Sequence, residues 1–268
     1  MHISLTRFNQ TSFDRTTGTA KVGTGLKSEE AYQQLEPFNV SIAAGRVSGV
    51  GVGGFTLGGG YSWTTNQVGL SCDTVVAFEV ALPTGKVVTT TNTSNADLFF
   101  GLKGGGNNFG IVTAITYKVV EQPAVWGGLV VVNGDANITS LSQAISDFQD
   151  TNTDPKAVIG VTYGFDPSFG GKDSYPDHWR SKVDLWLPLG LFLSVFYYYH
   201  GPSPPSGTFD PLLAVPSVSS SLSVTSLTRL VSAFNGPEVA PRANWRSISI
   251  NNYTVPVLQE IATQVKAS

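Results

Sequence analysis

Two glycine-rich stretches, Gly49–Gly60 and Gly104–Gly110, are the residues of this sequence that are best suited to binding chemistry. Glycine loses more conformational entropy on folding than any other residue, so such a density indicates a need for positive φ or for close backbone approach. The backbone N–H groups of a glycine-rich loop can form an anion-binding nest, which suits a pyrophosphate. Each stretch lies next to a predicted strand, and we expect them to form two backbone walls around one ligand.

The first stretch also matches a dinucleotide-binding fingerprint. Residues 49–54 read G-x-G-x-x-G, and Asp73 follows about 20 residues later, where a ribose ligand would stand. That fingerprint must open a helix, whereas the glycines at 58–60 oppose helix formation, so we reject the Rossmann interpretation. No Walker pattern follows either stretch. From spacing alone the glycines could equally make bulges and tight turns in a β-rich domain such as a glycine-rich lectin.

Other residues do not define a reaction. Tyr197 and Tyr199 share one face of a predicted strand, where a tyrosine could act as a base, although an aromatic sheet face packed against helices is the favoured interpretation. His178 and His200 stand beside loop residues and are expected at the surface. Cys72 is the single cysteine, which excludes an internal disulfide framework and disfavours a Cys/His zinc site. The sequence has no G-x-S-x-G elbow and no recognisable carboxylate pair, and no catalytic residue is assigned.

The elements that must position these residues are strands mixed with amphipathic helices. Local sequence patterns predict helices over 28–35, 97–102 and 140–149, and apolar residues recur at helical spacing over 227–234 and 258–265. Strands are predicted over 3–8, 76–82, 86–91, 111–120, 125–132, 157–163 and 191–199. Residues 165–176 and 201–207 are predicted loops. We therefore expect an α+β fold in which helices cover a sheet.

Composition narrows the class of protein further. Charged residues make up 13% of the chain and the formal net charge is -3, with no Lys/Arg cluster, so nucleic acid is not an expected partner. The most apolar stretch, residues 185–199, is too short to span a bilayer, and no membrane partner is expected. The first residues do not resemble a signal peptide, although five N-x-[ST] sequons hint at a secretory route, which leaves the localisation undecided.

Four blocks follow one another in a fixed order: Gly-Val-Gly-Val-Gly-Gly-Phe-Thr-Leu-Gly-Gly-Gly at 49–60, Cys-Asp-Thr-Val at 72–75, Asp-Leu-Phe-Phe at 97–100, and Lys-Gly-Gly-Gly-Asn-Asn-Phe-Gly-Ile-Val-Thr at 103–113. Together they resemble the PCMH-type FAD-binding domain, the family of vanillyl-alcohol oxidase and berberine bridge enzyme, and most of all the fungal FAD-linked oxidoreductases of secondary metabolism. The resemblance is close over residues 1–122 and weaker beyond.

The resemblance implies a second FAD subdomain over 1–122 and a partial substrate-binding domain with an antiparallel, helix-covered sheet over 123–268. It implies oxidation of a small organic substrate by hydride transfer to flavin N5, with dioxygen as the oxidant that restores the flavin. By position, backbone groups from both stretches would contact FAD: Gly51, Gly53, Gly54, Gly58, Gly59, Gly60, Gly110, Ile111 and Val112.

The sequence also departs from the family pattern. Met1 falls well inside the family's FAD domain, beyond the histidine that usually links the flavin, and the region of the usual Tyr or Glu base lies past residue 268. Val47 occupies the position of a second, cysteine link, so any flavin bound by this chain is expected to be non-covalent. A truncated gene model or fragment would explain these departures, and a catalytically incomplete remnant that only binds or supports a partner is the alternative function.

Side chains around the glycines have two interpretations each. Cys72 is expected to be a small buried side chain rather than a redox thiol, and Asp73 to hold a turn. Arg46 could face a flavin carbonyl or be a solvated charge. Tyr61 and Trp63 could line the flavin edge or belong to the core.

Overall fold

The computed structural model describes residues 3–165, 190–234 and 252–267. The chain divides into two compact units. The N-terminal unit comprises Met1–Ala124 and Thr225–Glu238, and the C-terminal unit comprises Val125–Val224 and Val239–Ser268. His178 and residues 166–176 of the predicted loop lie outside the described residues.

The N-terminal unit is built on a five-stranded antiparallel sheet in the order β1-β2-β6-β4-β5. Its strands are β1 (Thr11–Asp14), β2 (Thr19–Gly23), β4 (Val75–Ala81), β5 (Val87–Thr90) and β6 (Ile111–Lys118), and β3 (Val40–Ser41) pairs separately with β7 (Val120–Glu121). Buried Val22, Phe78, Val80, Ile115 and Tyr117 supply the core of this sheet.

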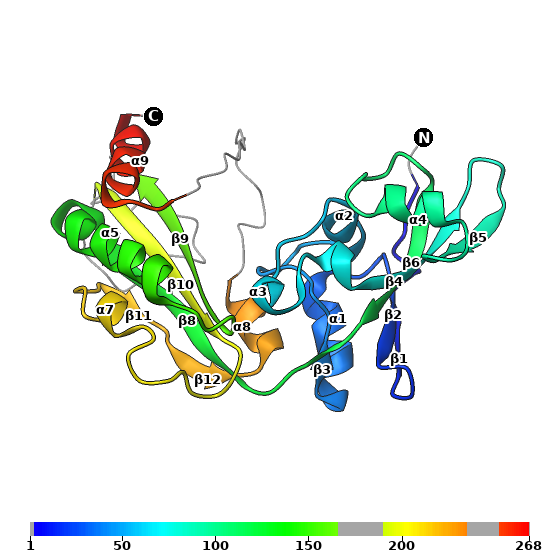
Figure 1. The fold of residues 1–268 in the computed structure, drawn as a ribbon, viewed down its shortest axis with the longest axis horizontal. Coiled ribbons are helices and arrows are strands. Elements are labelled where there is room, and N and C mark those ends of the chain that lie inside the picture. The colour runs from blue at the N-terminus through cyan, green and yellow to red at the C-terminus, as the bar shows by residue number, and fades with distance from the viewer. Residues whose placement is uncertain (1–2, 166–189, 235–251, 268) are drawn as a thin grey trace. The chain divides into compact units, whose positions relative to one another are not determined.

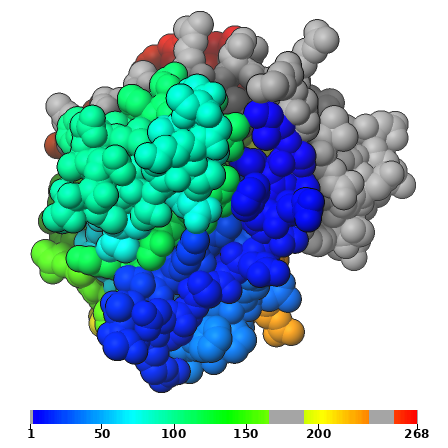
Figure 2. Space-filling view, turned by 90° about the vertical axis from the view of Figure 1, so that its right-hand side faces the viewer, coloured from blue at the N-terminus to red at the C-terminus, as the bar shows by residue number. Residues whose placement is uncertain are grey.

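Short helices surround that sheet. They are α1 (Ser28–Leu35), η1 (Glu36–Phe38), α2 (Val52–Leu57), α3 (Thr65–Val68), η2 (Ser71–Thr74), α4 (Ala96–Leu102) and α8 (Leu227–Ala233). Figure 2 views this unit from the side on which α4 and β5, in teal, lie next to the N-terminal residues in dark blue.

The C-terminal unit has an antiparallel sheet in the order β11-β8-β10-β9. The strands are β8 (Val125–Asn133), β9 (Ala157–Phe165), β10 (Leu191–Tyr199) and β11 (Ser219–Ser220), and β12 (Ser223–Thr225) also pairs with β8. Helices α5 (Gly134–Thr151), α7 (Asp210–Leu213) and α9 (Val255–Ala267) cover one face of this sheet (Figure 1). The expected α+β class and helix-covered antiparallel sheet are confirmed.

Most predicted elements form where periodicity places them, but two predictions are wrong. Residues 3–8 form no strand, because Ile3 and Phe8 are exposed and Phe8 N–H donates to Leu5 O in a turn instead. The first hairpin is β1–β2, whose turn is held by Asp14 Oδ1 accepting from Thr16 N–H at 2.8 Å.

The second wrong prediction is that the glycines at 58–60 prevent a helix from opening in the first glycine stretch. Gly51 is the N-cap of α2, a helix of 6 residues that ends at Gly58. Burial of Val52, Thr56 and Leu57 against the unit's core outweighs the low helix propensity of glycine. The Rossmann interpretation still fails, because every pairing in this sheet is antiparallel.

Candidate functional site

Helix α2 presents two faces of opposite character. Val52, Gly53, Thr56 and Leu57 are buried, whereas the other face is exposed. The glycines on the exposed face are Gly51, Gly54 and Gly58. Their spacing of three and four residues places them along one line of the helix surface, where only backbone is presented.

Local structure explains several of the predicted cofactor-binding glycines. Gly59 and Gly60 have φ of +101° and +80°, and a Cβ on Gly60 would lie 2.6 Å from the Phe55 ring. Gly110 has φ of +151°, and its Cβ would lie 2.8 Å from Ala81 O. The fold of the chain itself therefore requires glycine at these three positions.

Gly51 and Gly54 have no such explanation. Neither has a positive φ, and a Cβ added at either position would meet no heavy atom within 4 Å. The first-turn N–H groups of a helix also have no intrahelical acceptor. A ligand that packs directly on the backbone would account for both glycines.

The two glycine-rich stretches are joined by hydrogen bonds. Gly106 N–H, in the second stretch, donates to Leu57 O at the end of α2 at 3.0 Å. Thr24 makes a second connection, because its Oγ1 donates to Val112 O at 2.7 Å while its Cβ lies 3.1 Å from the place of a Cβ on Gly53. The structure thus brings the predicted walls together. Thr24 could not be identified from the sequence, since a lone threonine carries no pattern.

A buried hydroxyl network fixes the base of this arrangement. Thr56 Oγ1 lies 2.9 Å from Ser71 Oγ and 2.8 Å from Tyr117 Oη, which ties α2 to η2 and to β6. Burial raises the pKa of Tyr117 well above its usual range, so its hydroxyl stays protonated and structural. Ser71 N–H donates to Gly60 O at 2.8 Å, and Cys72 N–H to Gly59 O at 2.9 Å.

Cys72 and Asp73 have the structural roles that were expected. Cys72 is buried, and burial raises the pKa of its thiol, which disfavours the reactive thiolate. The Asp73 carboxylate accepts from Leu70 N–H at 2.9 Å and so holds the turn into η2. The ribose role that the fingerprint suggests for Asp73 is not needed to explain it.

The prediction that backbone N–H groups of the glycine-rich loop bind an anionic ligand does not hold for Gly49. The Glu29 carboxylate, from the first turn of α1, accepts from Gly49 N–H at 3.0 and 3.1 Å and from Ser48 Oγ at 3.0 Å. This N–H group is therefore already satisfied by an internal anion. Gly51 and the exposed glycines of α2 differ from Gly49, because no acidic side chain among the described residues accepts a hydrogen bond from their N–H groups.

At the start of β6, Ile111 is half-buried and opposite Ala81, whereas Val112 is buried and opposite Val80. The Val112 carbonyl is the acceptor of the Thr24 hydroxyl. Both residues thus support the second glycine-rich stretch from within the sheet.

Arg46, Tyr61 and Trp63 form a cluster at the two ends of the first stretch. The Arg46 guanidinium carbon lies 5.1 Å from the centre of the Tyr61 ring and 5.6 Å from that of the Trp63 ring. Trp63 Nε1 donates to Arg46 O at 3.1 Å. Trp63 is buried and Tyr61 exposed, while Arg46 is half-buried, so its interpretation as a solvated charge is wrong.

In the C-terminal unit, Tyr197 and Tyr199 belong to the core on the helix-covered face of the sheet. Burial raises the pKa of Tyr197 to about 12 and that of Tyr199 above its usual value, so neither is a base at neutral pH. The aromatic-core interpretation is confirmed. The surface prediction for His200 is wrong, because this side chain is buried and stacks on the Tyr198 ring.

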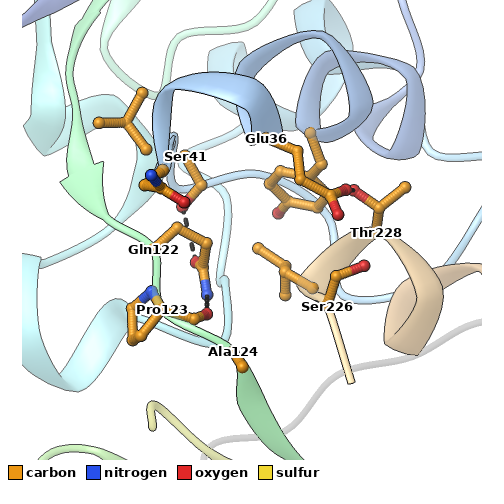
Figure 3. Close-up of a pocket in the computed structure, with 11 residues that line it drawn as sticks. Glu36, Ser41, Gln122, Pro123, Ala124, Ser226 and Thr228 are labelled. Carbon is orange, nitrogen blue, oxygen red and sulfur yellow. Dashed lines mark hydrogen bonds between the residues drawn. The ribbon is translucent and has the colours of Figure 1, made fainter.

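A separate pocket of about 150 Å³ lies in the N-terminal unit (Figure 3). Ser41 Oγ donates to Gln122 Oε1 at 2.9 Å on one side, and Thr228 Oγ1 donates to Glu36 on the other. None of the predicted cofactor-binding residues lines it.

Among residues 3–165, 190–234 and 252–267, no group of three His, Cys, Asp or Glu side chains is arranged to hold a metal ion. No helix in the described part of the chain is long and apolar enough to cross a membrane.

Comparison with known proteins agrees with this geometry. A family model described as an FAD binding domain matches residues 1–91. An uncharacterized FAD-linked oxidoreductase of Arthroderma benhamiae is 39% identical over 217 residues, which cover 81% of this chain and 39% of that protein. The FAD-dependent monooxygenase drtC of Aspergillus calidoustus is 32% identical over 244 residues, covering 91% of this chain and 42% of that protein.

Solved structures show the same fold. Physcomitrella patens BBE-like 1 aligns with a TM-score of 0.73 at 19% identity, over 98% of this chain and 56% of that one. The 6-hydroxy-D-nicotine oxidase of Arthrobacter nicotinovorans aligns with a TM-score of 0.67 at 20% identity, over 84% of this chain and 46% of that one. The chain is a relative of the PCMH-type FAD-binding oxidoreductases. It spans about two fifths of the length of the two curated relatives above, and FAD is the cofactor of the matched domain.

Proposed function

We propose that this chain contributes an FAD cradle to an FAD-dependent oxidoreductase that oxidises a small organic, secondary-metabolite-like molecule. The observation that carries the proposal is the exposed glycine face of α2, where Gly51 and Gly54 leave open space that the chain itself does not fill. The names of the relatives support the reaction class, because they are FAD-linked oxidoreductases and monooxygenases.

The chemistry that FAD would supply here is hydride acceptance at N5, with dioxygen as the proposed oxidant of the reduced flavin. The chain's own residues bind and orient. Gly51, Gly54 and Gly58 allow a ligand to approach the α2 backbone, and the second stretch, joined to α2 through Gly106, forms the other wall. Thr24 and the network of Thr56 hold the two walls at a fixed separation. A site that is rigid before the ligand arrives loses less entropy on binding.

The attachment of the cofactor by this chain is proposed to be non-covalent. Val47 offers no thiol, and the single thiol, that of Cys72, is buried and protonated. We further propose residues 1–122 as the second FAD subdomain and 123–268 as part of the substrate-binding domain. No residue of the described chain is assigned as the catalytic base.

Flavin retention is the direct test of this proposal. We expect the purified protein to be yellow, with flavin absorbance that co-elutes with it in gel filtration and is released into the supernatant on acid precipitation. A folded, colourless protein with no affinity for added FAD would contradict the proposal. Flavin fluorescence that stays with the acid precipitate would contradict the non-covalent attachment alone.

Turnover needs a separate measurement. Release of hydrogen peroxide on addition of candidate alcohols or amines would support an oxidase. Flavin reduction without peroxide would support a dehydrogenase, and flavin binding with neither would favour a binding module.

A further inference from the structure

The Arg46 guanidinium is a half-buried cation that has no counterion among the residues that the structure describes. Burial lowers its pKa, yet an arginine remains charged at every physiological pH. Within the part of the chain that the structure describes, no carboxylate forms an ion pair with it and its N–H groups make no hydrogen bond. A partly buried charge without a partner is unfavourable, so this arrangement calls for an anion.

The acidic side chain that contacts the glycine loop, Glu29 of α1, is already hydrogen-bonded there. Its carboxylate accepts from Gly49 N–H and from the Ser48 hydroxyl, and it forms no ion pair with Arg46. The guanidinium carbon instead lies over the rings of Tyr61 and Trp63. A cation–π contact supplies no hydrogen-bond acceptor to the guanidinium, so its N–H donors remain for a ligand.

The position of Arg46 is also fixed. Its carbonyl accepts from Trp63 Nε1, and Trp63 is buried with its ring 6.2 Å from that of Phe234. The side chain is therefore held at the mouth of the first glycine-rich stretch, between Gly45 and the N-cap of α2, rather than moving freely in solvent.

We propose that Arg46 is an anion-binding residue of the cradle and that it takes an oxyanion of two or more oxygens, carried by the bound cofactor as a diphosphate or by the substrate as a carboxylate. The planar fork of arginine matches both groups in a bidentate manner, and such charge-assisted pairs are the stronger hydrogen bonds. This inference deepens the proposed function, because binding of a cofactor diphosphate by Arg46 requires that the chain bind FAD.

The test uses R46Q and R46K, with R15Q as the control because Arg15 is an exposed arginine of the same unit. The first arm measures the Tm of each protein with inorganic pyrophosphate or sodium acetate. We expect pyrophosphate, acetate or both to raise the Tm of the wild type and R15Q by roughly 2–4 °C at tenfold excess over Kd. R46Q should show no such rise, and R46K a smaller one, because lysine keeps the charge but lacks the fork.

The second arm identifies the source of the oxyanion through affinities for FAD and for riboflavin, which has no phosphate. If the group is the diphosphate, R46Q should bind FAD roughly tenfold to a hundredfold more weakly than wild type, with riboflavin affinity unchanged. If the group belongs to the substrate, FAD affinity should stay constant while the acetate effect disappears.

The proposal is overturned if neither anion distinguishes wild type from R46Q and both bind FAD equally. A wild-type protein without affinity for flavin would refute the proposed function, but the Tm measurements with pyrophosphate and acetate would still test anion binding by Arg46. If R46Q does not fold, R46K gives the same comparison, and wild-type behaviour of R46K toward both anions and FAD would then overturn the inference.

Discussion

Gly54 in the N-terminal unit and Gly127 in the C-terminal unit both lie inside regular elements and have no positive φ, yet their surroundings are opposite. A Cβ on Gly127 would lie 2.3 Å from Tyr197 O, on the neighbouring strand β10. A Cβ on Gly54 would meet nothing within 4 Å. The packing of the chain explains the first glycine, whereas the second needs a cause outside the chain.

The same contrast extends to other glycines of the C-terminal unit. A Cβ on Gly134 would lie 2.5 Å from Leu191, and one on Gly164 would lie 2.2 Å from the Phe192 ring. In that unit, small residues make room for large side chains of the unit's own sheet. Glycine content alone therefore does not identify a ligand site, whereas a glycine that faces open space without a positive φ points to one.

The largest effect is expected for Gly127→Ala. Because the new Cβ would collide with backbone rather than with a flexible side chain, we expect a loss of about 3 kcal/mol or more in the free energy of unfolding. Urea denaturation measures it. Gly160→Ala is the matched control, since its Cβ would lie 3.8 Å from Phe196 and should change stability little. Equal stability of the two variants would show that close packing does not explain the glycine at position 127.

Thr24→Val tests the joint between the two glycine-rich stretches. Valine keeps the shape but removes the 2.7 Å hydrogen bond, which leaves the Val112 carbonyl without its hydroxyl donor. We expect a loss of roughly 1–3 kcal/mol in unfolding free energy, together with weaker FAD binding. Thr89→Val, at an exposed strand position, is the control. A Thr24→Val protein with unchanged stability and FAD affinity would show that this joint does not position the cradle.

The accuracy of sequence reasoning differs between these regions for physical reasons. Helix α1 forms over the predicted residues because Ala31, Tyr32 and Leu35 give a buried face at helical spacing. Helix α5 begins six residues before the predicted start, at an N-cap where Asn133 Oδ1 accepts from Ala136 N–H. Helices of this kind can be predicted from their local sequence, although the exact start depends on an N-cap residue that is easily overlooked.

Features that depend on distant residues were not predictable. Helix α2 forms against its own propensity because burial of Thr56 and Leu57 depends on Ser71 and Tyr117, and the burial of Arg46 depends on rings 15 and 17 residues away. The glycine-rich stretches themselves could be identified from sequence. Which glycines serve the fold and which leave open space could be distinguished only by their neighbours.

The smallest effect concerns acid stability in the two units. Hydrogen bonds from Thr113 and Lys21 hold the pKa of Glu79 in the N-terminal unit below its usual value. A lowered pKa stabilises the fold above the unfolded-state value, near 4.5, and that contribution is lost as pH falls through the folded-state pKa. We therefore expect Glu79→Gln to lose about 1 kcal/mol at pH 7 and to match wild type near pH 3.

Unfolding free energies measured between pH 7 and pH 3 check this expectation. Asp135→Asn in the C-terminal unit is the comparison, because Lys266 and Leu191 N–H likewise lower the pKa of Asp135, but at a more exposed site. Its effect should be below about 1 kcal/mol. A pH-independent difference for Glu79→Gln would contradict the assignment to its carboxylate.

The central claim, that the open face of α2 is kept bare for FAD, is tested most directly by measuring FAD affinity and unfolding free energy on the same Gly54→Ala protein. The account predicts at least tenfold weaker FAD binding with stability unchanged or raised by up to about 1 kcal/mol, because alanine favours the helix and meets no neighbour in the chain. A stable Gly54→Ala protein that binds FAD as tightly as wild type would contradict it.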